Sequence, residues 1–185
     1  MRFPADDSER RKWQNPEAIL ASLGLKEGDV FVDVGCGEGF FALPAAHIVG
    51  TKGRVYGIDV NPDAIERLTN AARQEGLAHL NAMVGVGETT VACEECADVI
   101  FYGICLHDFR DPEAVLACAR RMIKDSGILI DLDWKPVPSP FGPPLRIRFS
   151  LEKAERLITA GGFSIRSTRD VGPWHYCITA EPVPR

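Results

Sequence analysis

The stretch VDVGCGEG at residues 32–39 decides the fold, because it joins an apolar run to three alternate glycines. Residues 30–34 predict a buried strand, and the segment up to Val49 that follows the glycines predicts a helix. Glycine is required where the backbone turns tightly or lies directly against a ligand. Three glycines between a strand and a helix are typical of a cofactor-binding turn at the carboxyl edge of an open α/β sheet.

A second apolar run, at residues 55–58, ends in Asp59, twenty residues after Gly39. A carboxylate at this position can accept hydrogen bonds from both hydroxyls of a ribose. The glycine turn and Asp59 together predict a cofactor that contains a nucleoside.

Two cofactor classes fit this pattern. The spacing Gly37-x-Gly39-x-x-Ala42 matches the alanine-ended dinucleotide fingerprint, so NAD remains an alternative. Asp33, two residues ahead of the first glycine, is a poor neighbour for phosphates and a suitable one for a cation. S-adenosylmethionine has no phosphate and carries a sulfonium and an ammonium, so Asp33 favours it.

Residues 33–39 closely resemble motif I of class I S-adenosylmethionine-dependent methyltransferases, and Gly57-Ile58-Asp59 resembles their ribose-binding acidic loop. Val86 stands where this family usually has an acid for the adenine, so Glu88 or backbone groups are expected to replace it. The resemblance implies a set of cofactor-binding positions. They are Asp33, Gly35, Cys36, Gly37, Gly39, Asp59, Val60, Gly87, Glu88 and Tyr102.

Residues 98–112 resemble motif IV and the following turn in the ubiquinone/menaquinone-biosynthesis-like branch of these enzymes, where a strand ends in Leu-His-(His or Asp)-Phe-x-Asp-Pro. The resemblance spans roughly Glu9 to Pro182. It implies that His107 and Asp108 are catalytic candidates beside the transferred methyl group, with His107 as a proton acceptor. The alternative is that Asp108 and Asp111 only cap the following helix and that His107 packs or hydrogen-bonds to backbone. The chain lacks the (Asn/Asp)-Pro-Pro-aromatic sequence of amine-directed relatives, which counts against methylation of DNA bases or glutamine.

Apolar runs and helical patterns alternate along the chain and predict a doubly wound, mostly parallel α/β sheet of seven strands in one domain, residues 1–185. The last two strands form a C-terminal antiparallel hairpin. We expect strands at 30–34, 54–58, 82–86, 98–104, 128–132, 163–171 and 175–180. We expect helices at 16–23, up to 49, from 62 through 72, from 112 to about 126 and at 151–160.

The segment from Trp134 to Ser150 holds five prolines, which keep the backbone extended. Because it follows the fifth strand at the ligand edge, it is expected to form one wall of an acceptor pocket or, alternatively, a surface connection. In the first case Arg146 or Arg148 turns inward to bind an anion, and the region Arg11–Trp13 closes the opposite side. Four residues are expected to bind the acceptor. They are Cys105, Trp134, Arg146 and Arg148.

Composition argues against nucleic-acid and membrane partners. A net charge of −5 provides no field to attract nucleic acid, and no apolar run approaches the roughly 20 residues of a membrane span. The start of the chain lacks the apolar core of a secretory signal, so a cytoplasmic protein with six reduced cysteines is expected. Cys93 and Cys96 form a C-x-x-C pair without further ligands at zinc-finger spacing, so we expect no metal site.

The sequence therefore predicts an enzyme that binds S-adenosylmethionine and methylates a small-molecule acceptor. The alternatives are an NAD-dependent oxidoreductase and a non-catalytic cofactor-binding subunit. The acceptor and the oligomeric state do not follow from the sequence.

Overall fold

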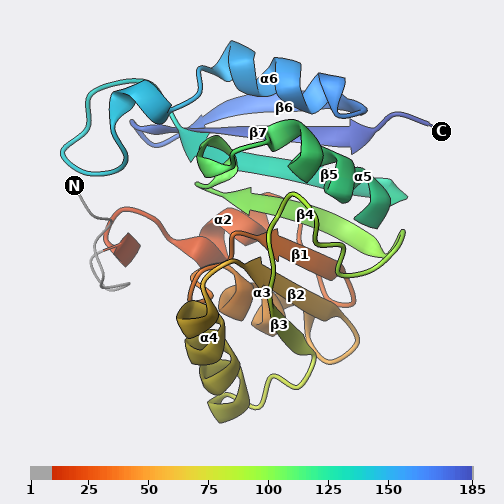
Figure 1. The fold of residues 1–185 in the computed structure, drawn as a ribbon. Helices are drawn as coiled ribbons and strands as arrows, with labels where there is room; N and C mark the ends of the chain where they lie inside the picture. Colours follow the sequence, from red (N-terminus) through yellow and green to blue (C-terminus); the bar gives the residue numbers. More distant parts are fainter. Residues whose placement is uncertain (1–9, 185) are drawn as a thin grey trace.

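The fold is a seven-stranded sheet with helices on both faces (Figure 1). A computed structural model describes residues 10–184. The strand order is β3-β2-β1-β4-β5-β7-β6; the pairs from β3 to β5 are parallel, and β7 is antiparallel to both of its neighbours. The expected doubly wound sheet with an antiparallel terminal hairpin is confirmed. The strands are β1 Val30–Val34, β2 Arg54–Asp59, β3 Leu80–Val84, β4 Ala97–Gly103, β5 Ile123–Trp134, β6 Phe163–Val171 and β7 His175–Pro182.

Most helices begin at a polar cap, as the sequence indicates. The helices are α2 Pro16–Ser22, α3 Ala42–Val49, α4 Pro62–Gln74, α5 Pro112–Met122 and α6 Leu151–Ala160, with 3-10 turns η1 Leu106–Asp108 and η2 Leu145–Ile147. Asn15, Asn61 and Asp111 each accept an amide hydrogen bond with their side chains, and a proline occupies the next position in all three helices. The side-chain acceptor satisfies a free amide while proline has none to satisfy, so each pair fixes a helix start.

Strand alternation divides the core between the two faces of the sheet. Phe31 packs with residues of α2, α3 and α4, whereas its neighbour Val32 packs with residues of α5 and α6. Successive side chains of a strand point to opposite faces, so a strand covered on both sides is apolar throughout. Within residues 10–184 no helix is both long and apolar enough to cross a membrane.

The boundary between α5 and β5 differs from the expectation. The helix ends at Met122 and β5 begins at Ile123, not near residue 128. Ile123 has extended backbone angles and pairs with Ala97, and the register shifts before the next pair, Val99 with Ile128. The intervening residues form an irregularity in the strand, which hides its period from the sequence pattern. The third strand is also displaced by two residues, to Leu80–Val84.

Two of the six cysteines are paired, so the expectation that all are reduced is wrong. Cys93 and Cys96 form a disulfide in the connection between β3 and β4, with their Cα atoms 5.9 Å apart. The other four thiols, Cys36, Cys105, Cys118 and Cys177, are free. The disulfide closes a short loop directly before β4.

A thiol titration tests this pairing. Protein denatured without reductant is expected to show four reactive thiols, and the same protein after reduction is expected to show six. Cys96→Ser should leave five thiols under both conditions. Six reactive thiols in the unreduced wild-type protein would contradict the disulfide.

Candidate active site

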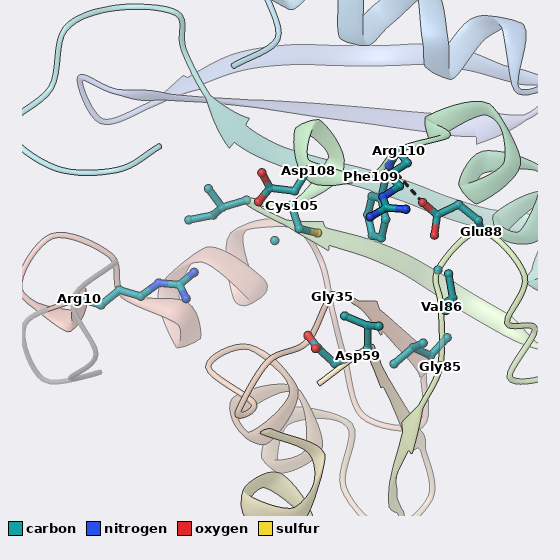
Figure 2. A pocket seen from close by; sticks show the side chains of 15 residues that line it. Arg10, Gly35, Asp59, Gly85, Val86, Glu88, Cys105, Asp108, Phe109 and Arg110 are labelled. Carbon is teal, nitrogen blue, oxygen red and sulfur yellow. Dashed lines mark hydrogen bonds between the residues drawn. The ribbon is translucent and has the colours of Figure 1, made fainter. Parts of the chain in front are cut away.

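A cavity of about 720 Å³ lies at the carboxyl ends of β1, β2, β3 and β4 (Figure 2). The turns that follow these four strands form most of its lining. Further lining residues come from η1 and the turn after it, and Arg10 comes from the N-terminal segment. A cavity of this size at this edge of an open α/β sheet suits a cofactor with part of a second substrate. Its lining consists of Arg10, Gly35, Ile58, Asp59, Val60, Gly85, Val86, Gly87, Glu88, Gly103, Ile104, Cys105, Asp108, Phe109 and Arg110.

The glycine turn is tightly bonded to the protein itself. Gly35 has a φ of +80°, and a Cβ atom there would lie 2.9 Å from the sulfur of Cys105, so only glycine fits. The amides of Gly35 and Cys36 donate to the carbonyl of Ile58. The amide of Gly37 donates to Asp59 Oδ2 at 2.8 Å. These amides therefore do not point at a bound pyrophosphate, as those of a dinucleotide-binding turn do.

Asp59 is fixed at the floor of the cavity by both of its oxygens. Oδ2 accepts the Gly37 amide, and Oδ1 accepts the amide of Asn61 at 2.9 Å. A carboxylate oxygen can accept more than one hydrogen bond, so Asp59 can still receive hydroxyl groups from a ligand.

Asp33 is a buried carboxyl group that the protein leaves incompletely paired. It is 2% exposed, and its Oδ2 atom has no hydrogen-bond partner among residues 10–184. Burial raises the pKa of Asp33 to about 7; the charge of Arg10 opposes this shift and that of Asp59 adds to it. Such a group favours a cation that enters beside it.

The part of the cavity lined by Val60, Val86 and Phe109 is apolar. Val60 and Val86 expose 67% and 48% of their surface and both line it. The ring of Phe109 lies so close to Gly87 that a Cβ there would be 2.6 Å from a ring carbon. Glu88 adds a carboxylate, which accepts the amide of Arg110 at 3.1 Å (Figure 2). Two exposed valines beside a carboxylate suit a flat ring that carries an amino group.

Five of the ten predicted cofactor positions line the cavity, namely Gly35, Asp59, Val60, Gly87 and Glu88. Asp33, Cys36, Gly37 and Gly39 lie in β1 or its turn outside the lining. Tyr102 is fully buried on the α5 face, where its hydroxyl donates to the carbonyl of Val115 at 3.4 Å. Burial raises the pKa of Tyr102, so it remains a neutral core residue.

His107 is buried behind the cavity wall. Its Nδ1 atom lies 2.7 Å from Asp133 Oδ1, and its Nε2 atom lies 3.3 Å from Asp108 Oδ1. Burial lowers the pKa of His107, but the hydrogen bond and charge of Asp133 and the charge of Asp108 outweigh this effect, so the pKa is raised. Asp108 lines the cavity. Burial raises the pKa of Asp108, and the positive charge of His107 opposes this shift.

Sequence reasoning missed Asp133. Its signal was a pair of carboxylates at alternate positions, Asp131 and Asp133, within the apolar end of β5; both are fully buried. Buried carboxylates in a strand need a partner or a function.

Ile104 adopts a left-handed backbone conformation at the cavity wall, with a φ of +66°. This conformation is unusual for a β-branched residue and costs on the order of 1–3 kcal/mol. Its amide donates to the carbonyl of Leu132 at 2.7 Å, which holds the turn between β4 and η1 in place. The turn presents Cys105 and Asp108 to the cavity (Figure 2).

The segment from Trp134 to Ser150 lies near this edge, but the expected inward arginine is not found. Arg148 donates to the carbonyls of Lys135, Val137 and Pro143 and to Ser139 Oγ, and its guanidinium stacks on Trp134. Arg146 is exposed. Neither arginine lines the cavity, and Trp134 is fully buried. Prolines cannot donate to neighbouring carbonyls, so Arg148 satisfies them and organises the loop.

The expected closure of the cavity by Arg11–Trp13 is not found, because none of these three residues lines it. Trp13 packs against Phe141 and stacks on His175, with ring centroids 4.7 and 5.5 Å apart. The guanidinium of Arg10 lies 3.7 Å from the ring centroid of Phe40 and reaches the cavity (Figure 2). An aromatic cluster thus joins the N-terminal segment, the proline-rich loop and the β6–β7 turn.

A protein family described as a methyltransferase domain matches residues 25–139. The chain belongs to this methyltransferase family. The match covers β1 to β5 and thus every cavity-lining residue except Arg10.

Individual relatives agree with this assignment. Aklanonic acid methyltransferase DauC of Streptomyces sp. (strain C5) is 42% identical over 62 residues, 34% of this chain and 28% of that protein. Nocamycin O-methyltransferase of Saccharothrix syringae is 32% identical over 122 residues, 66% of this chain and 43% of that protein. The chain thus spans less than half the length of these two curated relatives.

A solved structure matches over the full length. A SAM-dependent methyltransferase from Aquifex aeolicus has a TM-score of 0.89 and 26% identity, and the match covers 98% of this chain and 100% of that chain. The fold agrees on both sides of the family match, including the terminal hairpin.

Proposed function

We propose that the protein binds S-adenosylmethionine at the carboxyl edge of the sheet and transfers its methyl group to a small-molecule acceptor. The observation that carries this proposal is the incompletely paired Asp33 carboxyl beside a glycine turn whose amides are already bonded. This pairing suits a cationic ligand and does not suit a pyrophosphate. S-adenosylmethionine, when bound, supplies a methyl group on a positively charged sulfur.

The residues present fit each portion of this cofactor. Asp33 and Gly35 would hold the amino-acid portion, with Asp33 opposite its ammonium group. Asp59 would accept the ribose hydroxyls. Val60 and Val86 would cover the adenine faces, and Glu88 would accept its amino group, which compensates for the missing acid at Val86.

The acceptor is proposed to lie beside Ile104, Cys105 and Asp108, at the end of the cavity away from the valines. Methyl transfer is a displacement at carbon, so these residues mainly align the acceptor and exclude water. The names of the relatives support a small-molecule acceptor: one methylates aklanonic acid, another is a nocamycin O-methyltransferase, and a third is a demethylmenaquinone methyltransferase of Geobacillus kaustophilus. Location in the cytoplasm and the absence of nucleic-acid partners stay predictions from the sequence.

A search for the product tests the activity. Protein incubated with methyl-labelled S-adenosylmethionine and a small-molecule cell extract is expected to yield a labelled product by mass spectrometry, with one S-adenosylhomocysteine per product. Asp59→Ala, assayed beside it, should lose most of the product. Tight cofactor binding without any labelled product from several extracts would favour the non-catalytic subunit.

The pH dependence of cofactor binding tests the role of Asp33. With a pKa of about 7, the carboxyl is mostly protonated at about pH 5.5 and mostly ionised at about pH 7.5. An ammonium binds the ionised form, and the α-amino group stays charged below about pH 7.7. Calorimetry should therefore show S-adenosylhomocysteine binding about tenfold tighter at the higher pH.

Asp33→Asn provides the matched control. It should abolish most of the pH dependence and bind weakly at both pH values. It should also raise the melting temperature at about pH 8, because a carboxyl whose folded pKa lies above its ordinary 3.8 destabilises the fold once it is ionised. Equal pH dependence in the variant and the wild type would contradict the assignment of Asp33.

A further inference from the structure

Asp133 makes an unusual set of contacts for a residue buried within a strand. Its Oδ1 atom accepts the amide of Trp134 at 2.7 Å and lies 2.7 Å from His107 Nδ1. Its Oδ2 atom accepts the amide of His107 at 3.2 Å. A carboxylate only accepts, so Nδ1 must carry the hydrogen that it donates to Asp133. Asp133 therefore fixes the position, the rotation and the protonated nitrogen of the imidazole.

The remaining ring nitrogen of His107 points toward the cavity wall and does not reach the cavity. Nε2 is buried, has no hydrogen-bond partner among residues 10–184 and lies 3.3 Å from Asp108 Oδ1. The His107 side chain is 1% exposed, whereas that of Asp108 is 60% exposed and lines the cavity. Of the two, only Asp108 is placed to touch an acceptor.

We propose that Asp108 is the catalytic base and that His107 and Asp133 are positioning residues that stabilise its carboxylate from behind. The inference rests on the proposed methyl transfer and specifies its acceptor as a molecule that brings a proton on its nucleophilic atom, such as a hydroxyl. That O–H bond breaks, and its proton moves to the Asp108 carboxylate. The electron pair left on the acceptor atom forms the bond to the methyl carbon, and the sulfur keeps the electrons of the broken S–C bond. The proton then leaves exposed Asp108 for solvent.

Other charged groups act on the relay formed by Asp108, His107 and Asp133. The carboxylates of Asp133 on β5 and Asp108 on η1 favour the charged form of His107, whereas Arg148 in the proline-rich loop disfavours it. Asp108 receives a stabilising charge from His107 and a repulsive one from Asp133. Cys105, Arg110 and Arg10 line the same cavity. The His107 imidazolium is the positive group in direct contact with Asp108, so its charge state should control the basicity of Asp108.

Removing the imidazolium distinguishes the two possible bases. His107→Gln removes the positive charge beside Asp108 and leaves an uncharged side chain. If Asp108 is the base, its pKa rises, part of the activity is retained, and the acidic limb of the rate profile moves to higher pH. If His107 is the base, the variant loses its activity.

The first measurement needs no acceptor. In protein saturated with S-adenosylhomocysteine, nitrogen NMR of the imidazoles follows His107, and carbon NMR of labelled carboxyl groups follows Asp108. His107→Gln is expected to raise the pKa of Asp108 by about one unit. Asp133→Asn should lower the pKa of His107, which loses its carboxylate partner, and also that of Asp108, which loses a repulsive charge. An unchanged or lowered pKa of Asp108 in His107→Gln, or an unchanged pKa of His107 in Asp133→Asn, would overturn the relay.

Asp131→Asn is the matched control. Asp131 lies two residues earlier on the same face of β5 and is equally buried, but burial raises its pKa, so asparagine preserves its neutral state. It should leave the His107 and Asp108 titrations unchanged. A purely structural role of Asp133 would lower the melting temperature and leave both titrations as in wild type, which contradicts the proposal.

The second measurement uses the extract fraction that wild-type protein methylates. Asp108→Asn is expected to lower the rate by about 10²–10⁴-fold with cofactor affinity retained. His107→Gln should move the acidic limb upward by about one pH unit. A downward shift, a complete loss of activity in His107→Gln, or full activity of Asp108→Asn would overturn the inference. Failure of wild-type protein to methylate any fraction would instead overturn the proposed function, while the NMR titrations would still decide whether the charges are coupled.

Discussion

The geometry of the cofactor edge depends on the Asp59 carboxylate. One oxygen accepts the amide of Gly37 and the other accepts the amide of Asn61. A single side chain thus joins the glycine turn after β1 to the start of α4, where Asn61 itself caps the helix. Hydrogen bonds to a charged acceptor are among the stronger ones in a folded protein. Loss of Asp59 would release both turns that form the floor of the cavity.

Buried carboxyl groups characterise the rest of the site. Asp33 and Asp133 are buried at the same edge, and one oxygen of Asp33 has no hydrogen-bond partner within residues 10–184. Burial of such groups costs free energy that the empty fold does not recover. A ligand with fixed positive charge offsets this cost on the Asp33 side. On the Asp133 side the protein supplies its own positive group, His107.

Local patterns predicted the elements well, because cap residues and strand alternation act over a few neighbouring positions. Asn61-Pro62 and Asp111-Pro112 each begin a helix where the sequence indicates one. The glycine turn with Asp59 predicted the cofactor edge for the same reason. Alternation in β4 could also have placed Tyr102 on the α5 face instead of in the cavity.

Contacts between distant residues could not be predicted in this way. His107 meets Asp133 only because η1 follows β4 and β5 lies beside that strand, 26 positions along the chain. The alternation of Arg146 and Arg148 suggested an anion-binding pair. The guanidinium of Arg148 instead donates to carbonyl groups of the proline-rich loop. The register shift at Ile123 likewise depends on its pairing with Ala97. Tertiary context, not local propensity, decides these positions.

Calorimetric titration of S-adenosylmethionine and NAD into wild-type protein, Asp59→Ala and Asp63→Ala tests the central claim most directly. Asp63 is an exposed carboxylate in the first turn of α4, the helix that follows Asp59, and it lies outside the cavity lining. The account predicts that wild type and Asp63→Ala bind S-adenosylmethionine equally, that Asp59→Ala binds it about ten- to a hundredfold more weakly, and that NAD does not bind. Binding of NAD at the glycine turn, or an unchanged affinity of Asp59→Ala for S-adenosylmethionine, would contradict it.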